Sequence, residues 1–285
     1  MDPLISVSDL KTRIDDPGVR IADVRWYLNE PGRGLREYEG GHLPGAIFVD
    51  LDKDLAAPSG AGRHPLPEPT AFARRLGELG FGSDDVIMAY DDVGGAVAAR
   101  LWWMLDNLGH PRVALLDGGM RAWQAAGLPL TTDISPARPA LMELADGWSN
   151  TLDRDALVGR LGAVTLLDAR APERYRGEVE PVDSQPGHIP TAVNAPARLA
   201  LGQDGRFLAP AEIAERYVAL APSDRPTVAS CGSGVTACHT ALAFRVAGLP
   251  DPLLYPGSYS DWSGTDMPVA TGDEPGRLDP DGPRA

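Results

Sequence analysis

The sequence predicts an α/β protein that consists of two tandem, doubly wound units, each built on a parallel sheet. Short apolar runs that suit buried strands alternate with longer stretches that suit helices, which is typical of parallel sheets with helices on both faces. In addition, a series of motifs recurs in the same order in the two halves of the 285-residue chain. This constant order indicates that one unit has been duplicated.

Four pairs of segments carry the duplication. The pairs are Ile21–Arg25 with Leu167–Arg170, Gly41–Ala46 with Gly187–Asn194, Asp85–Tyr90 with Thr227–Ser230, and Leu115–Trp123 with Leu254–Trp262. The third pair is predicted to form buried strands, each followed by a helix, over Ala96–Leu108 and Val235–Ala247. We therefore expect equivalent strands and helices in both halves.

The stretches between these motifs set the expected domain boundaries. Residues 136–150 follow a Pro-rich start at Ser135 and have no clear period, so they are predicted to link a domain at 1–135 to one at 151–285. The Pro/Gly-rich end from Asp273 predicts a poorly ordered tail. Ala56–Pro69 is predicted to be a long surface loop that could lie over a cleft, although most such loops only connect elements.

Composition narrows the classes of function. With 43% hydrophobic and 23% charged residues, the chain is expected to be globular. Its net charge of −14 argues against binding to nucleic acid or anionic membranes. No signal peptide or long apolar run is found, which predicts a cytoplasmic protein. The two cysteines, Cys231 and Cys238, lack the paired Cys/His spacing of a zinc site.

The stretch around Cys231 holds the candidate site. Cys231 follows the predicted strand Thr227–Ser230 and precedes the turn Gly232-Ser233-Gly234 and a helix. Glycines can adopt positive φ and turn backbone N–H groups inward to form an anion nest, to which the helix N-terminus adds partial positive charge. Ligands of parallel sheets bind beyond the carboxyl ends of strands. The position therefore favours a thiolate nucleophile over a buried structural cysteine.

The spacing after Cys231 argues against one class of cysteine enzyme. Phosphatase-like loops with the pattern Cys-x5-Arg use their arginine to clamp a phosphate bidentately. Here the sixth residue after Cys231 is Ala237. The sequence therefore argues against a phosphatase or an arsenate reductase of that kind.

The turn Cys231-Gly-Ser-Gly-Val-Thr-Ala237 resembles the active-site loop of the two-domain rhodanese-type sulfurtransferases, in particular that of their mercaptopyruvate branch. The resemblance covers nearly the whole chain and implies two rhodanese-like domains with the active site between them. The thiosulfate branch usually carries Arg and Lys where this sequence has Gly232 and Ser233. A neutral loop with a hydroxyl suits mercaptopyruvate, which has one carboxylate and a ketone, better than the thiosulfate dianion.

The resemblance implies a role for each residue of this turn. Cys231 would attack the sulfur of the donor and become a persulfide, and Ser233 would supply a hydroxyl that binds or passes a proton. Backbone N–H groups would hold the anionic sulfur. These groups belong to Gly232, Ser233, Gly234, Val235 and Thr236. Neither a metal nor an organic cofactor is required by this chemistry.

The first half lacks a nucleophile at the equivalent position. Asp91 or Asp92 stands there, and both remain possible matches to Cys231. A carboxylate cannot carry a transferable sulfur. Residues 1–135 are therefore predicted to form a non-catalytic lobe that supplies pocket walls.

Arginine side chains are candidates for binding the substrate. Arg174 matches the arginine with which the family binds the substrate carboxylate, and a planar guanidinium suits that group. The mercaptopyruvate branch often has a second arginine in a Glu-Pro-Arg element, where this sequence has Glu180-Pro-Val182. Arg176 could compensate for the missing arginine.

His42 and Trp26 are candidates from the first half. His42 is the family-matched partner of Ser233, although its turn recurs around His188, and a recurring histidine is typical of a structural role. Trp26 resembles a tryptophan of the pocket wall, with a core position as the alternative.

These observations predict a sulfurtransferase that moves sulfane sulfur from 3-mercaptopyruvate to cyanide, a thiol or thioredoxin. Thiosulfate is the alternative donor. A non-enzymatic persulfide carrier that a partner enzyme loads is the alternative from another class. The expected partners are a small anionic sulfur donor and a small thiol or thioredoxin, with no nucleic acid and no membrane.

Overall fold

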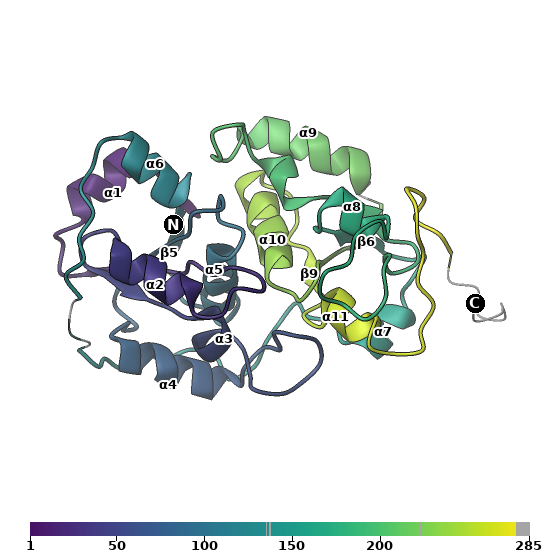
Figure 1. Ribbon diagram of the computed structural model, residues 1–285, viewed down its shortest axis with the longest axis horizontal. Coiled ribbons are helices and arrows are strands. Elements are labelled where there is room, and N and C mark those ends of the chain that lie inside the picture. Colours follow the sequence, from purple (N-terminus) through teal and green to yellow (C-terminus); the bar gives the residue numbers. More distant parts are fainter. Residues whose placement is uncertain (135, 137, 223, 278–285) are drawn as a thin grey trace. The chain divides into compact units, whose positions relative to one another are not determined.

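The computed structural model describes residues 1–134, 136, 138–222 and 224–277. They form two compact units (Figure 1). The first unit comprises residues 1–58, 66–149 and 201–207. The second comprises residues 59–65, residues 150–200 and the described residues from Leu208 onward.

The first unit is built on a parallel sheet with the strand order β1-β5-β4-β2-β3. The strands are β1 (Leu4–Ile5), β2 (Val19–Asp23), β3 (Ala46–Phe48), β4 (Val86–Tyr90) and β5 (Val113–Leu116). The helices are α1 (Val7–Arg13), α2 (Arg33–Gly40), α3 (Leu51–Asp54), α4 (Pro69–Leu79), α5 (Ala98–Asn107) and α6 (Gly119–Ala125). Met88 packs in a core with Leu10 and Trp123, whereas its neighbours Ile87 and Ala89 point the other way and are also fully buried. Both faces of the sheet are therefore covered.

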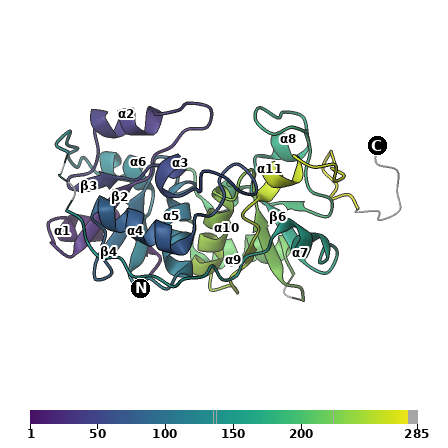
Figure 2. The ribbon, with the colours of Figure 1, turned by 90° about the horizontal axis from the view of Figure 1, so that it is seen from below.

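The second unit repeats this plan on a smaller parallel sheet with the order β7-β6-β8-β9. The strands are β6 (Thr165–Asp168), β7 (Val193–Asn194), β8 (Thr227–Ser230) and β9 (Leu253–Leu254). The helices are α7 (Arg154–Val158), α8 (Pro172–Tyr175), α9 (Pro210–Leu220), α10 (Thr236–Val246) and α11 (Ser258–Trp262), with a 3₁₀ turn at Ala197–Ala200. Figure 1 shows α9 and α10 on one side of the strands, with α7 on the other, and Figure 2 shows the same unit from below. The predicted doubly wound α/β fold is confirmed.

Local sequence signals explain where several helices begin. The side chains of Ser6, Asp50 and Asp153 accept backbone N–H groups at the starts of α1, α3 and α7, which are otherwise without intrahelical partners. Helices α4, α8 and α9 have proline in the first turn, where its missing N–H is not needed. The predicted helices after β4 and β8 are found as α5 and α10, with slightly later starts.

A buried arginine–aspartate pair occurs at the same place in each unit. Arg25 donates to the carboxylate of Asp23 at 2.7 Å, and Arg170 donates to that of Asp168 at 2.7 Å. Each arginine also donates to a glycine carbonyl in the turn that follows. Because the pair occurs in both units, it serves the fold of each unit and not the chemistry of one.

A stacked histidine also occurs in both units. His42 lies on Tyr38 with 3.9 Å between ring centroids, and His188 lies on Tyr175 at 3.7 Å. The Nδ1 atom of each histidine meets the carbonyl oxygen of the tyrosine on which it stacks. Both imidazoles are fully buried, and they join the helix after the first central strand to the next turn.

Two short segments pack into the unit to which the sequence repeat does not assign them. Residues 59–65 precede most of the first unit but pack in the second, whereas residues 201–207 pack in the first. The Arg63 N–H donates to Ser260 Oγ at 2.9 Å, and the Phe207 N–H donates to Asp117 Oδ1 at 2.8 Å. The first segment lies inside the predicted loop Ala56–Pro69, which is therefore more than a connection.

The predicted linker and tail also make specific contacts. The chain packs with the first unit as far as Ser149, and Trp148 Nε1–H donates to the Pro67 carbonyl at 2.9 Å. At the end of the chain, the carbonyl of Glu274 lies 3.2 Å from Nε2 of His188. The remainder of the predicted tail, residues 278–285, lies outside the described residues.

The turn after β8 requires glycine at one position. Gly234 has φ of +77°, and an added Cβ would lie 2.3 Å from the carbonyl oxygen of Pro256. Gly232, which was also expected to use positive φ, does not adopt it. Gly248 closes α10 with a similar φ of +68°, but an added Cβ there meets nothing within 4 Å.

This difference provides a matched pair of variants. We expect Gly234→Ala to lower the free energy of unfolding by about 2–4 kcal/mol, because it combines a strained φ with a clash against backbone. Gly248→Ala should lower the free energy of unfolding by only about 1 kcal/mol, because alanine there has an unfavourable φ but no clash. Urea unfolding of both variants measures the difference, and equal losses would contradict the close approach at Pro256.

His188 predicts a pH dependence of stability. Burial lowers the pKa of His188 below its ordinary 6.5, although the carbonyls of Tyr175 and Glu274 oppose this shift. The unfolded chain therefore binds the proton more readily, so this contribution to stability is complete above pH 6.5 and is lost as the pH falls through the lowered pKa. Urea unfolding at pH 7.5 and pH 5.5 should show a smaller loss in His188→Gln than in the wild type. The same loss in both proteins would contradict this prediction.

Candidate functional site

Cys231 lies directly beyond the carboxyl end of β8, as the sequence predicts. It is 3% exposed. Its N–H donates to Ser258 Oγ at 3.1 Å, and its carbonyl accepts the Tyr259 N–H at 3.0 Å. Ser258 adopts a φ of 51°, which is rare for serine and marks a local constraint. The start of α11 thus holds the backbone of Cys231 in place.

The first unit shows what the turn after a central strand can bind. Tyr90 pairs with Asp23 in the sheet as Ser230 pairs with Asp168, so Asp91 is the residue equivalent to Cys231. The Asp91 carboxylate accepts backbone hydrogen bonds of 2.8–2.9 Å from the turn and the start of α5. The donors are the N–H groups of Val93, Gly95, Val97 and Ala98. This turn is therefore an anion nest that an internal carboxylate occupies.

Burial and hydrogen bonding act against each other at Asp91. Burial raises the pKa of Asp91 above its ordinary value, and the backbone N–H groups partly offset this rise.

In the second unit, the N–H groups of Gly232, Ser233 and Val235 donate to no acceptor within the described part of the chain. They are available to an anion at Cys231.

A histidine meets the hydroxyl of the turn. Nδ1 of His64 lies 2.7 Å from Ser233 Oγ, and both side chains are buried. His64 belongs to the segment 59–65, whose Gly62 approaches the carbonyl oxygen of Gly257 so closely that an added Cβ would lie 2.4 Å from it. The imidazole and the hydroxyl can pass a proton along this hydrogen bond.

Arg174 lies beside the same turn, as the sequence predicts. Its Nη2 donates to Glu180 Oε1 at 2.8 Å and to Asp183 Oδ2 at 2.9 Å. A Cβ added to Gly232 would lie 3.5 Å from Nη1 of Arg174. The two carboxylates therefore fix a guanidinium next to the backbone that follows Cys231.

The carboxylates that hold Arg174 are buried and connected to a second arginine. Asp183 also accepts a hydrogen bond from Arg63 Nη1 at 2.7 Å. Burial alone would raise the pKa of Glu180, but the Asp183 N–H and Arg174 more than offset it, so its pKa lies below the ordinary value. Glu180 thus stays ionised and keeps its hold on Arg174 at neutral pH.

The structure corrects the prediction for His42. Its two ring nitrogens lie 2.7 Å from the Tyr38 carbonyl and 3.2 Å from the Asp133 carbonyl. No ring nitrogen remains for a serine hydroxyl, and the histidine that contacts Ser233 is His64. Burial among backbone acceptors therefore gives His42 a structural role.

Two other predicted residues make contacts of their own. Trp26, which belongs to the first unit, donates from Nε1 to Asp52 Oδ2 at 2.9 Å, and its place in the pocket wall stays a prediction. Arg176 donates to the exposed Glu178 at 2.7 Å and lies 3.7 Å from Asp273. These partners engage Arg176 away from the carboxylates that bind Arg174.

Sequence reasoning missed His64, Arg63 and Asp183. The first two lie in a Pro-rich loop, where the signal was a basic pair inside a stretch that could lie over a cleft or only connect elements. Asp183 directly follows the Glu180-Pro-Val182 element, where the resemblance implies a role for an arginine and none for a carboxylate. The contacts that bring these residues together span more than a hundred positions of sequence.

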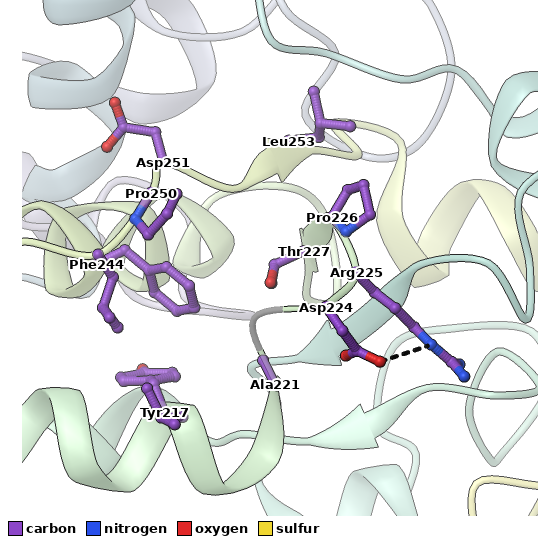
Figure 3. Close-up of a pocket in the computed structure, with 12 residues that line it drawn as sticks. Tyr217, Ala221, Asp224, Arg225, Pro226, Thr227, Phe244, Pro250, Asp251 and Leu253 are labelled. Atoms are coloured by element: carbon purple, nitrogen blue, oxygen red, sulfur yellow. Dashed lines mark ion pairs between the residues drawn. The ribbon is translucent and has the colours of Figure 1, made fainter.

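A separate cavity of about 440 Å³ opens at the other end of β8 (Figure 3). It is lined by apolar side chains such as Tyr217, Phe244 and Leu253, together with Pro226 and Thr227 at the start of the strand. Four residues of strand separate this end from Cys231, a distance of about 13 Å. The cavity is therefore distinct from the candidate site. Among the helices of the described residues, none is both long enough and apolar enough to cross a membrane.

Comparison with known proteins gives the family. The model of the rhodanese-like domain matches residues 6–126 and 153–265. A probable 3-mercaptopyruvate sulfurtransferase from Pseudomonas aeruginosa is 47% identical over 95% of this chain and 98% of that protein. The thiosulfate sulfurtransferase of Bos taurus is 35% identical over 86% of this chain and 85% of its own length.

A solved structure agrees with these relatives. The 3-mercaptopyruvate sulfurtransferase from Leishmania major is 31% identical and superimposes with a TM-score of 0.79, covering 92% of this chain and 74% of that one. Relatives of this kind act on small sulfur compounds, in agreement with the predicted substrate class. The chain belongs to the rhodanese-like family, with two such domains, and is a sulfurtransferase.

Proposed function

We propose that this sulfurtransferase takes its sulfur from 3-mercaptopyruvate and carries it as a persulfide on Cys231. The observation that carries this proposal is the hydrogen bond of 2.7 Å between His64 and Ser233, two residues from Cys231. Mercaptopyruvate releases a carbon leaving group that must gain a proton, whereas thiosulfate releases sulfite, which needs none. A buried proton-passing pair therefore favours the first donor.

Sulfur transfer to Cys231 is a displacement at the donor sulfur. The thiolate of Cys231 attacks the donor sulfur, a new S–S bond forms, and the C–S bond breaks with its electron pair on carbon. This gives the enolate of pyruvate, which takes a proton through Ser233 from His64. The enzyme keeps a persulfide, Cys231–S–SH, which ionises to a terminal sulfur anion.

The turn is suited to hold that anion. Its backbone N–H groups stand where the first unit uses equivalent groups to hold the Asp91 carboxylate. The residues assigned to this task are Gly232, Ser233, Gly234, Val235 and Thr236. Preorganised donors of this kind stabilise a negative charge without rearrangement. Arg174 is proposed to bind the donor carboxylate from the same side of the turn.

A thiophile would then remove the sulfur. We propose a small thiol or thioredoxin as the acceptor, with cyanide as its substitute in an assay. Thiosulfate remains the second candidate donor, because several relatives, the Bos taurus protein among them, bear that activity in their names. A carrier that another enzyme loads would need neither the Ser233–His64 pair nor Arg174.

The first prediction concerns the nucleophile and the donor. With cyanide as acceptor, we expect kcat/KM for mercaptopyruvate to exceed that for thiosulfate by at least about tenfold, and Cys231→Ser to abolish both activities. Cys238→Ser is the matched control, because Cys238 is fully buried within α10 and should retain activity. A thiosulfate preference would overturn the donor assignment. Inactivity with both donors, together with a persulfide formed by a desulfurase, would favour the carrier.

The second prediction concerns the proton. Ser233→Ala and His64→Gln should each lower kcat with mercaptopyruvate by about 10²-fold or more, the usual size of general acid–base effects. With thiosulfate as donor, the same variants should lose less than about tenfold, because sulfite leaves without a proton. Steady-state rates with both donors make this comparison within one protein. Equal losses with the two donors would indicate a structural role for the pair.

A further inference from the structure

Arg63 places a second guanidinium beside the Cys231 turn. Its backbone N–H is fixed by Ser260, and its Nη1 donates to Asp183 at 2.7 Å. A Cβ added to Gly232 would lie 3.3 Å from Nη2 of Arg63, slightly nearer than it would lie to Nη1 of Arg174. The two guanidinium groups thus face the same glycine, and Asp183 bridges them.

The donor groups of these arginines are only partly used. Arginine has N–H donors on Nε, Nη1 and Nη2. Nε of Arg63 is buried and has no hydrogen-bond partner within the described residues, which is costly unless a ligand supplies an acceptor. Arg174 uses Nε and Nη2 on its carboxylates, which leaves Nη1 toward Gly232. Nη2 of Arg63 and Nη1 of Arg174 therefore lie beside the same glycine, Gly232.

The charges around this place balance before any ligand binds. Arg63, Arg170 and Arg174 face the carboxylates of Asp168, Glu180 and Asp183. Asp183 and Glu180 are almost completely buried, so solvent cations do not reach them and their charges act on the guanidinium groups. Because no net positive charge is left over, each negative charge on a ligand adds to the cost of binding, so the site favours a monoanion over a dianion.

We propose that Arg63 is a specificity-determining residue that binds the carboxylate of the sulfur donor together with Arg174. One carboxylate oxygen accepts from Nε and Nη2 of Arg63, and the other accepts from Nη1 of Arg174. This inference rests on the proposed function, since it names the group that recognises the keto acid. The second arginine that binds the donor carboxylate is then Arg63, in the segment 59–65, and not Arg176.

The test compares three variants with both donors. Arg63→Met should raise KM for mercaptopyruvate by about 10- to 100-fold with kcat nearly unchanged, as expected when a charge-assisted hydrogen bond to substrate is lost. Arg63→Lys, which keeps the charge but lacks the guanidinium fork, should give an intermediate KM. Arg176→Met removes a charge from the same unit and should leave KM within about twofold of the wild type.

A binding measurement separates this inference from the proposed donor. Pyruvate, the carboxylate product, should bind the Cys231→Ser protein, and adding Arg63→Met should weaken that binding about as much as it raises KM. This readout needs no turnover, so it still tests Arg63 if thiosulfate proves to be the preferred donor. Thermal unfolding of each variant shows whether it is folded.

Three outcomes would overturn the assignment. The first is an Arg63→Met effect no larger than that of Arg176→Met. The second is a fall in kcat at constant KM, which would mean that Arg63 acts by positioning its neighbour His64. The third is a KM for Arg63→Lys equal to that of the wild type, which would show that the guanidinium fork is not used.

Discussion

The backbone N–H groups that follow the central strand are the constraint on which the site depends. Both units build a turn at this place, and in both the turn can surround a negative charge. In the first unit Asp91 fills the turn with its own carboxylate, which completes a structural element. In the second unit Cys231 stands at the equivalent position. The two units thus carry different side chains, a carboxylate and a thiol, at equivalent positions of the same kind of turn.

The arginines of the site lie in a protein with a large negative net charge. The chain carries a net charge of −14, so its overall field repels an anionic substrate. Two buried carboxylates hold positive side chains at the site. Asp183 and Glu180 hold Arg63 and Arg174 beside the turn, where their remaining N–H groups offer short-range hydrogen bonds to an anion. Held in advance, these donors lose little conformational entropy when a ligand binds.

Much of the fold could be predicted from local patterns. The strand Thr227–Ser230 and the helix that follows Cys231 were found at nearly the predicted residues, because apolar periodicity and glycine position depend on neighbours in sequence. The recurrence of Ile21–Arg25 as Leu167–Arg170 was also visible in the sequence, and each segment supplies a buried arginine–aspartate pair. For His42 the sequence left open a contact with Ser233 and a structural role, and the hydrogen bonds of its ring match the structural role.

The sequence by itself determined the α/β class, the duplication, the place of Cys231 beyond a strand and the candidate Arg174. Each of these depends on residues that are close together or that recur in a fixed order. Only the tertiary structure decided that His64 meets Ser233 and that Arg63 shares Asp183 with Arg174. These contacts join residues 169 and 120 positions apart. No local propensity encodes such a contact, because it arises only when a loop of one half of the sequence packs into the other folded unit.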